Sequence, residues 1–398
     1  MHRRRWRSPS PAPDRVAEHD VNGIRLVPIG PALAGALLVG VATAGGLVVI
    51  ALSVLGFPSL QPFGTLPLAT LLDVIKLAFA AIAGIGGIIA LVVAYRRQRL
   101  AEASAELEHA KEERERVRIL NERFGAAAGQ IGSDQPMVQL AGVYAMAALA
   151  DDWPEQRQTC VNVLCGYLRM PYEPDPGPDA SAAARVAFRR NREVRHAVIR
   201  VVRDHLNPHV GGALWHDCHF DFRGAVFDGG VFAYIEVPKG CSLNFLDAKF
   251  VDGVTEFQGS KFTGGVANFW RVDFAGGEVL FQGCQFTGGH VGFGDSTFSG
   301  GKIDFRSVDT DDGAEVAVFS ADVSFKRSRF IGAEVLFNRT HFVGGGVDFA
   351  GAEFSGGDID FTDAQFSGGE VDFTDVGDWS VPPSNLPPSA PGLRLPRR

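Results

Sequence analysis

The most regular apolar pattern in this 398-residue chain is a twelve-residue period in its C-terminal part. Val or Ile usually stands two places before a first phenylalanine, and a second phenylalanine follows five places later. A polar residue often separates the apolar pair, and this in–out–in alternation is typical of a half-buried β-strand. A fixed period predicts a solenoid, in which each unit buries its apolar face against its neighbours. The first phenylalanine is at 245, 257, 269, 281, 293, 305, 325, 337, 349, 361 and 373, and the second at 250, 262, 274, 286, 298, 330, 342, 354 and 366.

Turn residues and small residues complete this repeat. Glycine pairs such as Gly264-Gly265 and Gly288-Gly289 stand where the chain must turn with positive φ. Their density excludes a helix in this part of the chain. The residue two places before the second phenylalanine is small: Ala248, Ser260, Cys284, Ser296, Ser328, Thr340, Ala352 and Ala364.

A small residue two places before a large one, at five-residue steps, resembles the pentapeptide-repeat family from Phe220 to Val376. The resemblance implies an all-β domain, a right-handed, four-sided β-helix, which we assign to residues 219–376. In this chain the steps alternate between five and seven residues, which departs from the family pattern.

Two coil sizes fit the alternating steps: one twelve-residue period over two faces, or two such periods over four faces. The phase break between Phe305 and Phe325 falls four positions short of two periods, as if one coil had dropped both two-residue insertions. That interpretation favours the four-sided coil. We expect the irregular stretch 310–318 to bulge out as a loop.

The outward positions of the predicted solenoid carry an excess of negative charge. Residues 220–376 contain 24 acidic and 11 basic residues, a formal charge of −13 against −8 for the whole chain. Asp304, Asp348, Asp360 and Asp372 share one repeat position, immediately before the first phenylalanine. Solubility explains such charge, because an array of glycine and phenylalanine must resist edge-to-edge association. The family resemblance adds mimicry of DNA, by which some pentapeptide-repeat proteins bind topoisomerases. A calcium-binding β-roll is excluded, because its unit has nine residues.

The N-terminal hundred residues predict a membrane anchor. After a basic segment, 1–31, the stretch 32–57 has no charge and is long enough to span a bilayer as a helix. A second apolar stretch, 67–95, follows a short uncharged loop, and arginines flank the pair on both outer sides. The positively charged flanks of membrane helices usually lie on the cytoplasmic side. Residues 32–95 are therefore expected to form a transmembrane helical hairpin with both termini of the chain in the cytoplasm.

The middle of the chain predicts an α-helical cytoplasmic domain. Residues 96–170 comprise a charged helix and two short amphipathic helices, and the run 132–150 is similar to an armadillo/HEAT-like unit. This arrangement between membrane helices and pentapeptide repeats is typical of bacterial, especially actinobacterial, proteins of unknown function. Residues 171–206 form a proline-rich linker and a basic helix, 182–205, whose charged face is expected to be solvated, to contact anionic lipid or to dock on the acidic solenoid. We expect the proline-rich tail, 377–398, to be disordered.

The chain shows no catalytic motif. Its five cysteines form no C-x-x-C pair, which suits a reducing cytoplasm. His216, Cys218 and His219 are the one cluster of metal-capable donors, but three ligands within four residues give poor tetrahedral geometry. We therefore favour a packing role for this cluster and predict no catalytic, cofactor-binding or metal residue.

These patterns together predict a three-part, multidomain membrane protein that is not an enzyme. The expected function is a scaffold or interaction module that presents an acidic β-solenoid at the cytoplasmic face. It would bind an unidentified protein through the solenoid and lipid through residues 32–95, and would not bind nucleic acid directly. The alternative is a regulator that inhibits a nucleic-acid enzyme, such as a topoisomerase, by charge mimicry.

Overall fold

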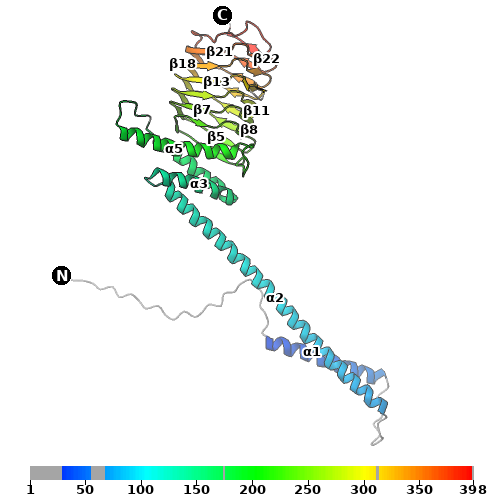
Figure 1. Cartoon of the computed structure of the whole chain (residues 1–398). Coiled ribbons are helices and arrows are strands. Elements are labelled where there is room, and N and C mark those ends of the chain that lie inside the picture. Colours follow the sequence, from blue (N-terminus) through cyan, green and yellow to red (C-terminus); the bar gives the residue numbers. More distant parts are fainter. Residues whose placement is uncertain (1–28, 55–67, 174, 311–312, 397–398) are drawn as a thin grey trace, which may run out of the picture. The chain divides into compact units, whose positions relative to one another are not determined.

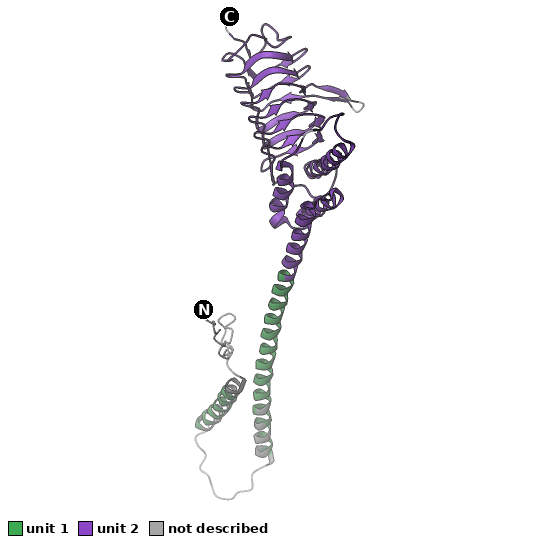
Figure 2. Ribbon diagram, turned by 90° about the vertical axis from the view of Figure 1, so that its left-hand side faces the viewer, with its two compact units in different colours: residues 1–114 green, residues 115–398 purple. Residues whose placement is uncertain are grey.

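The computed structural model describes residues 29–54, 68–173, 175–310 and 313–396, in two compact units. Unit 1 is residues 1–114 and unit 2 is residues 115–398 (Figure 2). We describe each unit by itself.

Unit 1 contains helix α1 (Ile29–Val54) and the first part of helix α2 (Leu68–Ile131). Among the described residues, one stretch, Phe79–Ile131 within α2, is long and apolar enough to cross a membrane. The helices approach each other at Gly40, where an added Cβ would lie 3.4 Å from Cγ1 of Ile85. The N-terminal basic segment and the inter-helix loop lie outside the described residues.

The helical part of unit 2 begins with the end of α2, which continues through the charged stretch without a break. The two predicted amphipathic helices are α3 (Pro136–Asp152) and α4 (Arg157–Arg169), joined by a short 3₁₀ turn, η1 (Pro154–Gln156). Pro136 stands in the first turn of α3, where a missing N–H costs nothing. The basic helix is α5 (Ala182–Leu206), and the Ser181 hydroxyl caps it by accepting a hydrogen bond from the Ala184 N–H.

Each coil of the solenoid contains two of the twelve-residue periods. The Asn268 amide donates a hydrogen bond to the equivalent Asn244 of the preceding coil, 24 positions earlier. In the same way, Val279 of one coil pairs in parallel with Ile303 of the next. The structure therefore decides between the two coil sizes, and the domain is a β-solenoid of about seven turns (Figure 1).

The described strands form two large sheets and one small hairpin. One sheet contains β1 (His219–Asp221), β4 (Glu236–Val237), β5 (Ser242–Asn244), β8 (Lys261–Asn268), β11 (Gln285–Gly292), β16 (Val318–Phe319), β17 (Val323–Ser324), β19 (His341–Phe342), β20 (Gly346–Asp348), β22 (Gln365–Phe366), β23 (Glu370–Asp372) and β24 (Leu393–Arg394). The other contains β2 (Val226–Phe227), β3 (Gly230–Val231), β6 (Lys249–Phe250), β7 (Val254–Glu256), β9 (Asp273–Phe274), β10 (Glu278–Leu280), β12 (Thr297–Phe298), β13 (Lys302–Asp304), β18 (Arg329–Leu336) and β21 (Glu353–Asp360). The hairpin pairs β14 (Val308–Thr310) with β15 (Gly313–Glu315).

Four columns of phenylalanine fill the solenoid, as the period predicts. Successive rings within a column have centroids between 4.4 and 5.2 Å apart, and every ring but that of Phe366 is at least 99 % buried. The columns are 222, 245, 269, 293, 325, 349 and 373; 227, 250, 274, 298, 330 and 354; 232, 257, 281, 305, 337 and 361; and 262, 286, 319, 342 and 366.

The small residues between the columns are buried and satisfied. Ser296 and Ser328 each donate a hydroxyl hydrogen bond to a phenylalanine carbonyl of the preceding coil, at 2.6 and 2.7 Å. The Cys284 thiol makes the same contact with the Phe257 carbonyl. A buried polar group with a partner costs little, so serine, threonine and cysteine fit this position as well as alanine does.

The phase break has a different cause from the one predicted. Phe325 stacks on Phe293, and beside them Arg327 binds Asp295 across 32 positions, whereas a regular coil separates such partners by 24. One coil is therefore longer than the others. The prediction of a coil with dropped insertions is therefore wrong, although the coil of two periods that it favoured is the one observed. The extra residues form the β14–β15 hairpin, which agrees with the expected bulge at 310–318.

Both ends of the solenoid are covered. At the first coil, α5 packs against β3, where Gly230 leaves room for the Ile199 side chain. At the last coil, Trp379 packs edge-on against Phe354 and Phe373, and β24 pairs with β23. The expectation of a disordered tail is therefore wrong for residues 377–396. The covers keep the edge strands of the solenoid from pairing with other chains.

Candidate functional site

Two departures from the repeat, the hairpin and Tyr234, meet at one place on the solenoid beside two glycines. The β14–β15 hairpin is inserted there, Tyr234 is the one aromatic residue at its repeat position, and Gly259 and Gly283 follow Tyr234 at that position in the next two coils. A repeat that breaks its own pattern at one place marks a feature that stacking alone does not require.

Tyr234 has a backbone conformation that aromatic residues rarely adopt, with φ of 61°. In the columns that begin with Phe222 and Phe232, every residue two places after a phenylalanine has positive φ except Ser307 and Asp375. Those with positive φ are Gly224, Tyr234, Asp247, Gly259, Arg271, Gly283, Asp295, Arg327, Arg339, Gly351 and Asp363. Tyr234 lies over Gly259, where an added Cβ would be only 2.4 Å from its ring. The glycine thus makes room for the tyrosine ring on the outer face of β4, β8 and β11, which is called the wall below.

Glu315 of β15 joins the hairpin to this wall. Its carboxylate accepts a hydrogen bond from the Tyr234 hydroxyl at 3.0 Å and one from the Gln258 amide at 3.2 Å. A Cβ added at Gly283 would lie 2.6 Å from Cβ of Glu315, so the second glycine gives the hairpin its seat. Two hydrogen bonds and a close fit hold β15 beside the solenoid.

A groove of about 530 Å³ lies between β15 and the wall. Its outward floor residues are Glu236, Lys261 and Gln285, which occupy equivalent positions on the adjacent strands β4, β8 and β11. The volume is within the range of about 300–1,000 Å³ that is typical of ligand pockets. The remaining lining residues are Pro208, His209, Tyr234, Gly259, Gly283, Ala314, Glu315 and Val316.

The groove presents polar side chains that are not consumed by the fold. Within the described residues, Lys261 has no salt bridge, and Glu236 has one weak contact, 3.4 Å from the Thr263 hydroxyl. Lys261 is exposed, and Gln285 is half-buried. A cation, a carboxylate and an amide on successive rungs can orient a ligand, whereas we find no nucleophile with an adjacent base among the groove residues.

The predicted acidic row does not form a free field of charge. Asp304 is fully buried because Arg306 and Gln282 bind its carboxylate and cover it, so it adds no exposed charge. Asp348, Asp360 and Asp372 each accept a hydrogen bond from the backbone N–H two residues later. These carboxylates therefore stabilise corner turns, which explains why Asp and Asn recur at that position.

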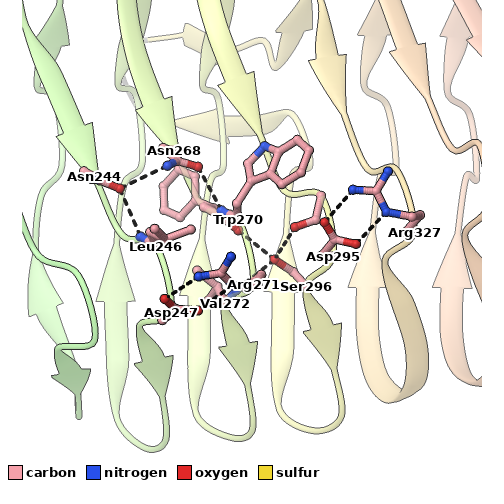
Figure 3. A network of polar contacts seen from close by, with 12 residues as sticks. Asn244, Leu246, Asp247, Asn268, Trp270, Arg271, Val272, Asp295, Ser296 and Arg327 are labelled. Atoms are coloured by element: carbon pink, nitrogen blue, oxygen red, sulfur yellow. Dashed lines mark hydrogen bonds and ion pairs between the residues drawn. The ribbon is translucent and has the colours of Figure 1, made fainter.

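Charged side chains at the turns of the column that begins with Phe222 are also paired with each other. Arg271 binds Asp247 through two hydrogen bonds of 2.7 Å, and Arg327 binds Asp295 in the same way (Figure 3). The Trp270 indole lies between these pairs and covers Gly292 and Gly294 of the next coil. The pairs offset much of the local charge, so this corner is nearly neutral.

The metal-capable cluster is held in packing and hydrogen-bonding roles. His216 contacts the Leu206 carbonyl, His219 contacts the Ser242 hydroxyl, and burial raises the pKa of the Cys218 thiol to about 12. Within the described residues, no group of three His, Cys, Asp or Glu side chains is arranged to hold a metal ion.

The basic helix α5 docks on the solenoid through the part that runs from Arg192 to its C-terminal end. Asp228 of the first coil accepts hydrogen bonds from Arg192 and Tyr172 and contacts His196. Burial alone would raise the pKa of Asp228, but the hydrogen bonds from His196 and Tyr172 and the charge of Arg192 lower it below its usual range. Arg195 lies over the Tyr172 ring and donates to two backbone carbonyls. Of the roles proposed for this helix, docking on the solenoid is confirmed.

Comparison with known protein families, curated proteins and solved structures found no match for this chain. The fold itself, a solenoid of about seven turns with stacked phenylalanine columns, is as in pentapeptide repeats.

Sequence reasoning did not identify Tyr234, Lys261 or Glu315 as residues of a shared site. One signal for this site was present in the sequence, since Tyr234 occupies a repeat position that otherwise holds glycine, Asp, Arg or Ser. The phase break was a second signal, because it marks the inserted hairpin. The sequence alone did not show that Tyr234 and the hairpin lie together, since that follows only once each coil is known to contain two periods.

Proposed function

We propose that the protein is a membrane-anchored, non-enzymatic scaffold whose solenoid binds a protein partner at the cytoplasmic face of the membrane. The observation that carries this proposal is the groove beside β15. Among the described residues, Lys261 on its floor has no ion pair, and its wall is built by residues that depart from the repeat. A site built from residues that depart from the repeat is expected to bind a ligand, because stacking of the coils does not require it. A solenoid also provides the long surface that protein partners use.

The membrane part of the proposal is a two-span helical hairpin. It is supported by the apolar stretch within α2, by the contact of α1 with α2 at Gly40, and by the apolar composition of 32–57. Arginines flank both outer ends, which places both termini in the cytoplasm under the positive-inside rule. Reporters fused at residue 62 and at the C terminus are then expected on opposite sides of the membrane. Signals from the same side would contradict the hairpin.

Charge mimicry is the weaker candidate. Asp304 and Asp360 use their carboxylates inside the fold, and the exposed Asp247 and the half-buried Asp295 are neutralised by arginines. An inhibitor that imitates DNA needs a continuous field of unpaired negative charge. The internal partners weigh against that requirement.

Photo-crosslinking in the native membrane tests the proposed function. A benzophenone amino acid replaces Gln285 in the groove, and in a matched control it replaces Thr297 on β12, which belongs to the other large sheet. We expect a discrete protein adduct from position 285 in the membrane fraction and none of that mass from position 297. Identical adduct patterns, or no adduct from either position, would refute binding through the groove. A topoisomerase adduct whose formation declines steeply with salt would favour mimicry.

A further inference from the structure

Among the described strands, β15 of the hairpin has an edge that no other strand covers. β14 and β15 form a two-stranded sheet, whereas β8 and β11 are paired on both sides. An uncovered edge presents backbone N–H and C=O groups to any extended chain beside it. Ala314, Glu315 and Val316 of this segment line the groove.

The edge is held in place before any ligand arrives. The Tyr234 and Gln258 side chains bind Glu315, and Gly283 lets the hairpin lie close against the wall. A strand fixed in this way loses little conformational entropy when another chain pairs with it, so more of the interaction energy contributes to affinity. An isolated two-stranded hairpin in water is marginal, and the wall contacts compensate for this.

The floor of the groove offers side-chain partners at the spacing of strands. Glu236, Lys261 and Gln285 stand on adjacent strands, about 4.8 Å from one to the next. Lys261, which has no salt bridge within the described residues, suits an acidic side chain of the partner. Val316 and the ring of Tyr234 add apolar surface at the sides.

From these observations we infer that the groove binds an extended, acid-bearing segment of a partner polypeptide, which adds as a third strand to β15. Backbone hydrogen bonds to the β15 edge supply affinity, and the Lys261 ammonium selects a carboxylate on the segment. This inference rests on the proposed function, because it names the kind of partner that the scaffold binds.

Selection from a phage library of random twelve-residue peptides tests strand addition, with the full chain in detergent as the target. Selected peptides are then measured against the wild type, Lys261→Glu, and the control Lys249→Glu. The control makes the same charge change on β6, in the other sheet. We expect peptides with at least one acidic residue, whose affinity decreases by about tenfold or more with Lys261→Glu and changes little with Lys249→Glu.

N-methylation of each peptide amide in turn identifies the binding mode. A strand that pairs along one edge uses alternate N–H groups, so methylation is expected to weaken binding at every second position only. Effects without this alternation, peptides indifferent to Lys261→Glu, or a library with no enrichment would overturn the inference. Self-association of the wild-type chain that Lys261→Glu abolishes would also overturn it, because the occupant would then be a second copy. If strand addition fails these tests but position 285 still gives a discrete crosslink, the proposed function stands and only this inference is wrong. If strand addition fails and position 285 gives no crosslink, the proposed function is refuted as well.

Discussion

Replacement of Phe281 by alanine tests whether the stacked columns hold the solenoid together. Phe281 is fully buried in the middle of its column, and its ring centroid is 4.9 Å from those of Phe257 and Phe305. It also meets Phe269 and Phe293 edge-on, at 5.6 and 5.7 Å. The substitution therefore removes a side chain that touches three successive coils.

The expected loss of stability is about 4 kcal/mol. Phe→Ala in a well-packed core costs about 3–5 kcal/mol through lost burial and the remaining cavity. A position with rings above, below and on two sides has little room to collapse, so the cost lies in the middle of that range or above. Phe281→Leu keeps most of the burial but loses the ring pairs, each of which contributes about 0.5–1.5 kcal/mol, and is expected to cost about half as much.

Hydrogen exchange of the full chain, followed by mass spectrometry, measures this loss locally. A decrease of about 4 kcal/mol corresponds to roughly a thousandfold faster exchange, because each 1.4 kcal/mol is about a factor of ten. We expect the largest effect in peptides from the coils of Phe257, Phe281 and Phe305. Phe366→Ala is the matched control, because Phe366 is 7 % exposed and stands at the end of its column, with a ring of that column on one side only, and it should cost less.

Two results would refute this reasoning. An acceleration of less than tenfold in the coils of Phe281 would show that the column contributes little to local stability. An effect of Phe366→Ala equal to that of Phe281→Ala would show that the stability of the array does not depend on neighbouring coils, contrary to the behaviour of a solenoid.

Three further predictions concern the groove and the two ends of the solenoid. Tyr234→Phe removes the hydrogen bond to Glu315 and should destabilise the hairpin by about 1 kcal/mol, measured as faster exchange of the β15 amides with no change in the α3 amides. Asp228→Ala leaves the half-buried Arg192, Tyr172 and His196 side chains without their shared carboxylate and should cost about 2 kcal/mol in the urea unfolding of the solenoid's first coil; a loss below about 0.5 kcal/mol would contradict the role of this network. Burial alone would raise the pKa of Asp360, but hydrogen bonds from Asn385, Thr362 and Asn338 lower it to about 2. The stability that this carboxylate adds is therefore present above about pH 4 and lost as the pH falls from about 4 to about 2, so Asp360→Asn should flatten the decline of the urea midpoint in that window, and an unchanged decline would refute the assignment.

The stability of the first coil is also expected to depend on pH under acidic conditions, because the pKa of Asp228 is lowered in the folded state, as that of Asp360 is. Its contribution is complete above the pKa of an unfolded aspartate, about 3.9, and decreases as the pH falls through the lower folded value. The carboxylates that the sequence presents as surface charge thus act as part of the fold.

The order of residues alone determined the interior of the solenoid. Each phenylalanine recurs at a period of twelve and is buried in the structure, because stacked coils leave no other place for an apolar ring at that position. The helices α3 and α4 were predictable for a similar reason, since their amphipathic spacing is a local signal. The bulge before Phe319 was predictable from the loss of the period.

Only the tertiary structure decided how far apart in sequence two neighbours on the surface are. Because each coil holds two periods and one coil carries the hairpin, Tyr234 and Glu315 meet across 81 positions, and no local pattern indicates that contact. The structure also decided that Asp304 is buried and that the tail seats on the last coil through Trp379. A period specifies which side chains face inward, because that depends on the alternation along one strand. Which outward side chains lie together depends on the length of the coil and on where an insertion falls, and these are properties of the stacked array.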